Sequence, residues 1–259
     1  SDFVEIGALN KKPIGETNFE IYKDDYCREI CKCGICGVYN NFHRLDMSTI
    51  YSGRYNSATY QNQLIEKFNK IMNLPPERSD NRQRVKRISD FYFKNNRSLK
   101  WNYVLVFGSG LCVFLAELKR YDVISHCIDP DKLSIKHALE NVRVDKAFCG
   151  NFEEVELDEK YDFISLNKVL EHVMNPIGWL KKIKTIMAPG AVVYIEVPDG
   201  KEALKNGKIQ DREEFFIEHY TVFSKESLMW FAKNLDFTIL KINSIKEPSG
   251  KYTVFGFFS

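Results

Sequence analysis

Apolar and polar positions alternate regularly from Trp101 onward, where short apolar runs are separated by helical patterns. The apolar runs predict strands at about 103–107, 123–128, 161–165 and 191–197. The helical patterns between them lie at about 111–120, 131–141 and 168–187. Alternation of this kind predicts a parallel sheet with helices on both of its faces.

The carboxyl end of the chain has a different pattern. Residues 237–245 and 251–258 are apolar, β-branched and aromatic runs, and Lys246-Glu247-Pro248-Ser249-Gly250 joins them. Two such runs around a turn predict an antiparallel hairpin. We therefore expect an α/β chain whose parallel sheet ends in an antiparallel C-terminal hairpin.

The first 56 residues have little helical periodicity and many turn formers, so they predict an irregular N-terminal appendage. The main domain is expected to span 57–259, and its first part, 57–98, to form a helical lid. Tyr51, Tyr55 and Tyr60 stand at this junction. They either pack the appendage against the main domain or form a lid over a bound ligand.

Four of the seven cysteines crowd into the appendage. Cys33-Gly34-Ile35-Cys36-Gly37 has the form of a metal-binding knuckle, in which two thiolates stand two residues apart and glycines let the backbone turn. Cys27 and Cys31, with His43 as a further candidate, can complete a structural zinc site. A reduced cluster without metal and an iron–sulfur cluster are the alternatives.

Composition narrows the range of partners. The 259 residues include 37 basic and 35 acidic side chains mixed along the chain, and the net charge is +2. This balance gives no electrostatic footprint for nucleic acid or for an anionic membrane. No stretch approaches the roughly 18 apolar residues of a membrane helix, and the amino terminus lacks a signal-peptide pattern. We expect a cytoplasmic protein with a small-molecule partner; the oligomeric state is not predicted.

The first strand of the regular region ends in a glycine turn. The run Val104-Leu105-Val106-Phe107 passes directly into Gly108-Ser109-Gly110. Open α/β sheets bind ligands at this edge, where the strands end. The second strand ends at Asp129, nineteen residues beyond Gly110, where an acidic side chain can bind both hydroxyls of a ribose. Asp129 can also cap a helix that starts at Pro130.

From Tyr103 to about Phe237 the chain resembles the class I S-adenosylmethionine-dependent methyltransferases of the small-molecule group. The resemblance rests on the glycine turn, Asp129, the motif Val169-Leu170-Glu171-His172, the turn Ala188-Pro189-Gly190 and the C-terminal hairpin. It implies a Rossmann-like, seven-stranded, mostly parallel sheet and S-adenosylmethionine as cofactor. The cofactor-binding residues that it implies are Phe107, Gly108, Ser109, Gly110, Asp129, Pro130, Asn151, Phe152, Asn167 and Lys168.

Two positions depart from the family pattern. The first strand usually carries an acidic residue where this chain has Val106, and Cys112 replaces the third glycine of the turn. These departures predict an atypical contact with the cofactor. A noncatalytic domain that binds cofactor is therefore an alternative to an enzyme.

The segment Glu218-His219-Tyr220 resembles the Glu-His segment of sugar methyltransferases, where that pair lines the acceptor site. We expect His219 to be the general base, Glu218 to tune its basicity, and Tyr220 to contact the acceptor. His172 is a second candidate base. The alternative for His219 is a structural histidine that packs at an interface.

Together these features predict methyl transfer to a hydroxyl of a small polar acceptor. A sugar or a phosphate-bearing intermediate of surface-polysaccharide (capsule) or natural-product biosynthesis is expected. The cysteine-rich appendage also resembles that of C-methyltransferases of nucleotide-linked keto sugars, so methylation of carbon in such a sugar is the second hypothesis. Nucleic-acid methylation is disfavoured by the balanced charge and by the lack of an Asn-Pro-Pro-Tyr motif.

Overall fold

A computed structural model describes residues 2–19, 26–45, 63–94 and 103–259. The chain packs into two compact units. The terminal unit comprises Ser1–Ile50, Leu166–Lys184 and Tyr194–Ser259, and the central unit comprises Tyr51–Ser165 and Thr185–Val193.

The main sheet has seven strands in the order β10-β11-β8-β7-β4-β5-β6. Their bounds are β4 Tyr103–Phe107, β5 Ile124–Asp129, β6 Lys146–Cys149, β7 Tyr161–Asn167, β8 Met187–Pro198, β10 Ile239–Lys246 and β11 Tyr252–Phe258. Strands β4, β5 and β6 pair in parallel, whereas β10 and β11 form an antiparallel hairpin. The predicted seven-stranded α/β fold and its terminal hairpin are confirmed.

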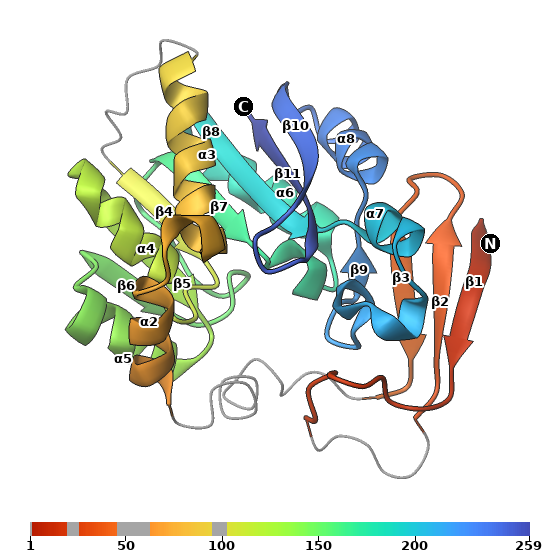
Figure 1. Ribbon diagram of the computed structural model, residues 1–259. Helices are drawn as coiled ribbons and strands as arrows, with labels where there is room; N and C mark the ends of the chain where they lie inside the picture. The colour runs from red at the N-terminus through yellow and green to blue at the C-terminus, as the bar shows by residue number, and fades with distance from the viewer. Residues whose placement is uncertain (1, 20–25, 46–62, 95–102) are drawn as a thin grey trace. The chain divides into compact units, whose positions relative to one another are not determined.

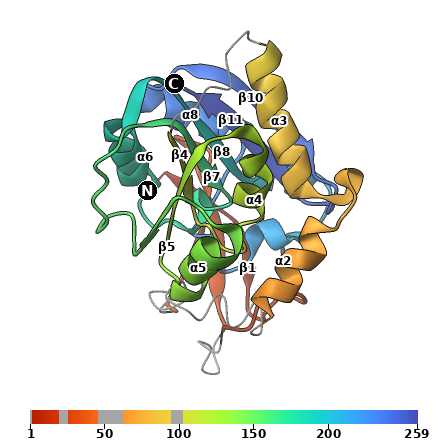
Figure 2. The same ribbon diagram turned by 90° about the vertical axis from the view of Figure 1, so that its left-hand side faces the viewer.

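Strand β4 is the apolar run that precedes the glycine turn. Its residues Val104, Leu105, Val106 and Phe107 are each at most 2% exposed. A strand that is covered on both faces needs apolar side chains at every position, and for this reason the run is continuous rather than alternating. In the central unit α5, Lys132–His137, packs on β5 and β6, and α4, Val113–Leu118, packs on α3, Asp80–Lys94 (Figure 2).

The N-terminal segment is not the irregular appendage that its composition predicts. It forms an antiparallel sheet of β1, Phe3–Leu9, β2, Arg28–Cys33, and β3, Tyr39–His43, and β9, Thr221–Val222, joins it as the fourth strand (Figure 1). Tyr39 pairs with Val222 in this sheet. Strands β1 to β3 have an ordinary length of five to seven residues, but turn formers surround them, and the two residues of the fourth strand come from a distant segment of the chain.

Helices flank the strands largely where the periodicity predicts them. The remaining helices are α2 Leu64–Met72, α6 Pro176–Thr185, α7 Gly200–Lys205 and α8 Lys225–Asn234. Shorter turns of helix are η2 Pro76–Arg78, η3 Lys119–Tyr121, η4 Ala138–Val142, η5 Leu170–His172, η6 Ile209–Asp211 and η7 Glu213–Phe215. The single helix expected over 168–187 is divided into η5 and α6, because Pro176 lacks a backbone N–H and favours the start of a helix.

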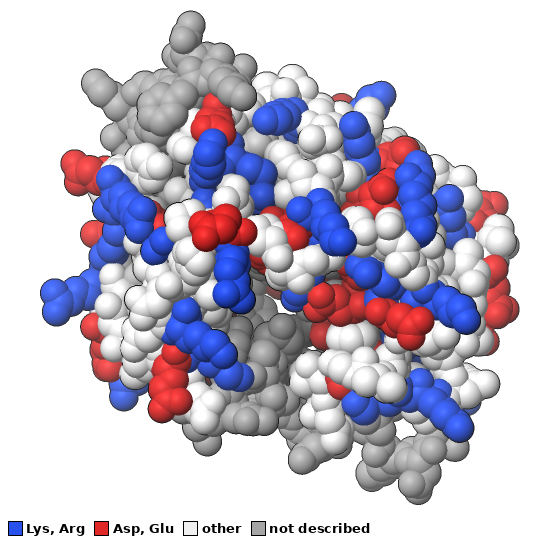
Figure 3. All heavy atoms as spheres, in the orientation of Figure 1, with Lys and Arg blue, Asp and Glu red and all other residues white. Residues whose placement is uncertain are grey.

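Within the described ranges, no helix is both long and apolar enough to span a bilayer. Basic and acidic side chains are interspersed over the face drawn in Figure 3. This mixture agrees with the balanced charge of the sequence.

Candidate functional site

The glycine turn after β4 is built on left-handed backbone. Gly108 has φ 63° and Gly110 has φ 47°, which residues with a Cβ adopt at a cost. The Gly108 N–H donates to the Ile128 carbonyl at 2.9 Å, so the turn is tied to the end of β5. Cys112, which replaces the third glycine, also adopts a positive φ, 55°, as the residue before α4. The turn therefore keeps its glycine-like shape without that glycine.

Asp129 closes the same turn from the end of β5. Its Oδ2 accepts the Gly110 N–H at 2.9 Å and the Ser109 hydroxyl at 3.3 Å, and its Oδ1 accepts the Asp131 N–H at 2.9 Å. Burial raises the pKa of Asp129, and these hydrogen bonds oppose the rise. The carboxylate is thus fixed in orientation beside Gly110. The helix cap is a different residue, because Asp131 accepts the Ser134 N–H at the start of α5.

The residues expected around an adenine lie close to this turn. The Gly150 N–H donates to the Asp129 carbonyl at 3.1 Å, which brings the next segment beside β5. Phe152 is buried and its ring lies edge-on to Phe107, with 4.6 Å between centroids. Asn151 is exposed. The central unit therefore brings together Phe107 to Gly110, Asp129, Pro130, Asn151 and Phe152.

Asn167 and Lys168, the other two residues expected at the cofactor, lie in the terminal unit at the end of β7. Lys168 has a left-handed φ of 57°, and its N–H donates to the Glu196 carbonyl at 2.8 Å. Its Nζ donates to the Thr253 hydroxyl at 2.6 Å. This lysine is therefore fixed at both its backbone and its side chain.

His172 and His219 lie together in the terminal unit, with 4.9 Å between ring centroids. His172 Nδ1 is 2.9 Å from the Glu218 carbonyl, and His219 Nδ1 is 2.8 Å from the Glu214 carbonyl. A carbonyl oxygen only accepts, so each Nδ1 carries the hydrogen and each lone pair is on Nε2. Burial lowers the pKa of His172 to about 4 and that of His219 well below its usual value. Both imidazoles are neutral at pH 7.

Glu171 completes this group. Its side chain is fully buried, and neither carboxyl oxygen has a hydrogen-bond partner among the described residues. Burial raises the pKa of Glu171 to about 8. One ligand atom each from Glu171, His172 and His219 lie within 4.8 Å of one another. Both histidines were candidate bases from the sequence, whereas Glu171 was only part of the motif Val169-Leu170-Glu171-His172 and had no role of its own.

Glu218 contacts the histidine pair through its backbone carbonyl. Its carbonyl binds His172, not His219, and burial raises the pKa of its own carboxyl to about 7. The tuning of His219 by the Glu218 side chain stays a prediction, as does the role of His219 as general base.

A buried ion pair positions the segment that carries His219. Arg28 on β2 bonds to Glu16 at 3.0 Å, to Asn41 at 3.0 Å and to the Phe215 carbonyl. Glu16 also accepts the Ile217 N–H at 2.8 Å. The Asn41 side chain in turn donates to the His219 carbonyl at 2.7 Å. The N-terminal sheet therefore fixes the backbone on both sides of Glu218.

The four clustered cysteines are only partly brought together. Cys33 and Cys36 hydrogen-bond across the turn between β2 and β3. Burial raises the pKa of Cys33, but hydrogen bonds from the backbone N–H groups of Cys36 and Ile35 outweigh this effect, so the pKa lies below its usual value. Within the described residues, no three cysteines form a group of the kind that Glu171, His172 and His219 form. Zinc binding by Cys27, Cys31, Cys33 and Cys36 stays a prediction.

The tyrosines expected at the acceptor are divided. Tyr51, Tyr55 and Tyr60 lie outside the described residues. Tyr220 is partly buried and stacks on His43, with 6.3 Å between ring centroids.

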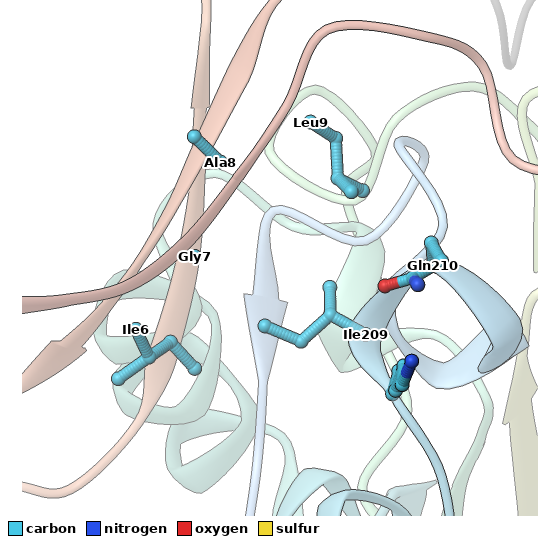
Figure 4. Close-up of a pocket in the computed structure, with 7 residues that line it drawn as sticks. Ile6, Gly7, Ala8, Leu9, Ile209 and Gln210 are labelled. Carbon is cyan, nitrogen blue, oxygen red and sulfur yellow. The ribbon is translucent and has the colours of Figure 1, made fainter.

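A small cavity of about 260 Å³ lies elsewhere in the terminal unit, and Ile6, Gly7, Ala8, Leu9, Lys208, Ile209 and Gln210 line it (Figure 4). None of the residues predicted for catalysis or cofactor binding lines this cavity.

A family model described as "Methyltransferase domain" matches residues 72–242 of the sequence, about two thirds of the chain. The chain belongs to this methyltransferase family. A search of curated proteins found no match. The fold of this methyltransferase is similar to those of solved methyltransferases that share little sequence with it.

Three of these structures show how much of the fold is shared at low sequence identity. Magnesium protoporphyrin IX methyltransferase from Synechocystis PCC 6803, with bound SAH, is 11% identical and has a TM-score of 0.59, covering 82% of this chain and 99% of its own. The plantazolicin methyltransferase BamL, in complex with an analogue and SAH, is 13% identical with a TM-score of 0.56, covering 81% and 94%. N-methyltransferase NodS from Bradyrhizobium japonicum WM9 is 12% identical with a TM-score of 0.51, covering 69% and 95%.

Proposed function

We propose that this methyltransferase uses S-adenosylmethionine as methyl donor and binds it at the glycine turn and Asp129. The hydrogen bond from the Gly110 N–H to Asp129 carries the proposal, because it fixes a carboxylate beside a turn of open backbone. A carboxylate has about four lone-pair sites, and Gly110, Ser109 and Asp131 occupy three of them, so Asp129 has one site left for a ribose hydroxyl. A second ribose hydroxyl takes the place of the long 3.3 Å bond from Ser109. Asn151, which is exposed, offers a polar edge for a base, and the buried Phe152 supports this segment from beneath by packing on Phe107.

The same proposal assigns cofactor contacts in the central unit to Phe107, Ser109 and Pro130, and the expected contacts of Asn167 and Lys168 stay predictions. When bound, the cofactor supplies an electrophilic methyl group on a sulfonium. The chain has to hold the acceptor, exclude water and take a proton from the acceptor hydroxyl. His219 takes that proton at Nε2, because its Nδ1 hydrogen is held on the Glu214 carbonyl. His172, whose ring lies beside it, is the second proton acceptor.

We assign a hydroxyl as the acceptor group for a chemical reason. A neutral amine attacks with its lone pair and needs no base at that moment, whereas a hydroxyl has to lose its proton. Two neutral imidazoles in one place therefore favour O-methylation. A sugar or phosphate-bearing intermediate of surface-polysaccharide or natural-product biosynthesis is the proposed substrate class, with Tyr220 as an acceptor contact.

Calorimetry with S-adenosylmethionine and S-adenosylhomocysteine tests whether the protein binds the methyl donor at the proposed site. We expect saturable binding by the native protein and a loss of roughly tenfold or more in Asp129→Ala, since a ligand hydroxyl then has no charged acceptor. Asp145→Ala is the matched control, because Asp145 lies in the same unit but bonds Ser125 instead. Absence of binding at millimolar ligand refutes the proposal.

Turnover with isotopically labelled methyl donor and a library of sugars, sugar phosphates and amines tests the proposed acceptor group and the base role of His219. Magnetic resonance of the product distinguishes a methyl on oxygen from one on carbon or nitrogen. With the acceptor found, His219→Ala should lower turnover by roughly 10² or more and leave cofactor affinity within twofold. A His219→Ala enzyme of full activity, or a product methylated only at carbon or nitrogen, contradicts the assignment.

A further inference from the structure

Glu171, His172 and His219 have a geometry that proton transfer alone does not require. Their three ligand atoms lie within 4.8 Å of one another, and all three residues belong to the terminal unit. Ligand atoms about 2.0–2.2 Å from a metal ion lie roughly 3–4 Å apart, so modest side-chain rotation closes the group around an ion. Among the described residues, this is the one group of three or more such side chains.

The two histidines are oriented as metal ligands usually are. A ligating imidazole nearly always donates its other N–H to a carbonyl or carboxylate, which fixes the tautomer and the ring. Both rings do so here, His172 toward the Glu218 carbonyl and His219 toward the Glu214 carbonyl. The carbonyls come from a segment that the buried Arg28 holds in place.

Glu171 provides the second, independent observation. Its carboxyl is fully buried, and neither of its oxygens accepts a hydrogen bond from a described residue. A buried polar group without a partner costs free energy, and a buried carboxylate costs more. A cation coordinated by one of these oxygens removes that cost.

We propose that Glu171, His172 and His219 bind one divalent transition-metal ion, zinc in the first place. Two imidazoles and one carboxylate are a ligand set that zinc uses in catalytic sites, and such sites keep at least one position open. Lys168 and Lys251 are the cationic groups whose charge acts on Glu171, and Glu196 is the anionic one. Because the two ammonium groups oppose a further cation, we expect weaker binding than at a closed zinc site of four ligands.

The ion changes how the acceptor is activated, and this consequence rests on the proposed function. A bound metal ion would lower the pKa of an oxygen that it coordinates, so an acceptor hydroxyl at the open position would release its proton to solvent water rather than to an imidazole. In the metal-loaded protein Nε2 of His219 would be a ligand, so the base role of His219 proposed above applies to the metal-free protein. Ion binding itself requires neither methyl donor nor acceptor.

Cobalt(II) is the probe, because its absorption reports both stoichiometry and ligand type. Protein freed of metal by chelator is titrated with CoCl₂ and then with ZnCl₂ as competitor, without cofactor. We expect one cobalt per chain, with visible bands of nitrogen and oxygen ligation, and displacement by zinc. Glu171→Gln and His219→Ala should each weaken binding roughly tenfold or more.

Two controls separate this site from other ligands in the chain. His43→Asn removes a partly buried histidine of the same unit, and Cys33→Ser with Cys36→Ser removes the cysteine turn; both proteins should bind cobalt as the native protein does. Circular dichroism and thermal unfolding of each variant establish that it is folded. Zinc should raise the melting temperature of the native protein but not that of Glu171→Gln.

Three results overturn the proposal. The first is no cobalt binding at millimolar concentration. The second is binding with the intense bands of thiolate ligation that vanishes in the cysteine variant. The third is unchanged affinity in Glu171→Gln and His219→Ala, which makes Glu171 a buried neutral acid. Failure of methyl transfer with a metal-loaded protein contradicts the proposed function instead and leaves ion binding standing.

Discussion

Replacing Arg28 with Met tests how the N-terminal sheet supports the histidine segment. The Arg28 and Glu16 side chains are both fully buried, and their ion pair spans 3.0 Å. The variant keeps the length of the side chain but removes the guanidinium. It leaves the Glu16 carboxylate buried, where it still accepts hydrogen bonds from the Ile217 N–H and the Tyr26 hydroxyl. It also leaves the Asn41 side-chain oxygen and the Phe215 carbonyl without this donor.

The expected loss of stability is large. Removing one partner of a buried ion pair costs about 3–5 kcal/mol, because the other charge is left uncompensated. Each buried acceptor that loses its donor adds about 1–3 kcal/mol, but neighbouring effects are not additive. We therefore expect Arg28→Met to lower the free energy of unfolding of the terminal unit by roughly 4–5 kcal/mol. Glu16→Gln in the same background should recover part of this loss, since it removes the uncompensated charge.

Urea unfolding followed by tryptophan fluorescence provides the measurement, because Trp179 and Trp230 both belong to the terminal unit. A double-mutant cycle over Arg28→Met and Glu16→Gln isolates the coupling between the two side chains. Hydrogen exchange at the Ile217 amide reports the segment directly. If Arg28→Met costs less than about 1 kcal/mol, or if the cycle gives no coupling, the ion pair does not hold this segment and the reasoning fails.

Three further substitutions have defined outcomes. Asp129→Ala removes the acceptor of three donors and should destabilise the central unit by about 3 kcal/mol in urea unfolding; a neutral effect contradicts the role of Asp129 in closing the glycine turn. Gly200→Ala places a Cβ 2.7 Å from a Val222 methyl and 3.0 Å from the Phe215 ring, so its thermal midpoint should fall by an amount equivalent to roughly 1–3 kcal/mol. Burial raises the pKa of Asp145, but hydrogen bonds from Ser125 outweigh it and lower the pKa below its usual 3.8. The stability that Asp145 contributes is present above that value and lost as the pH falls through the lowered pKa, so the difference between native protein and Asp145→Ala should be full at pH 6 and shrink below about pH 3.8.

The sequence predicted the main sheet well because its signals are local. The continuous apolar run of β4 and the glycines after it required a buried strand and a tight turn. The position of Asp129 at the end of the next strand followed from counting residues along that pattern. Strand β6 has four residues, none of them fully buried, and such a short strand has no periodicity to detect.

The histidine group could be predicted only in part, because it depends on contacts between distant segments. His172 and His219 were named from motifs, but their approach to 4.9 Å depends on how η5 and the residue 213–220 segment pack. The buried, unpartnered state of Glu171 is likewise a property of the fold. No pattern along the chain distinguishes a buried glutamate from the exposed glutamate of an ordinary helix.

The N-terminal sheet shows why a part of this chain with weak sequence signals still determines its site. Ile30 and Tyr39 on β2 and β3 share one apolar core with Ala203, Phe215 and Val222. The same strands carry Arg28 and Asn41, whose hydrogen bonds end on the Phe215 and His219 carbonyls. Apolar packing and hydrogen bonds from the N-terminal sheet thus both act on the segment from Phe215 to His219. A change in the sheet is therefore expected to reach the chemistry through backbone position at His219, without any contact between the changed side chain and the acceptor.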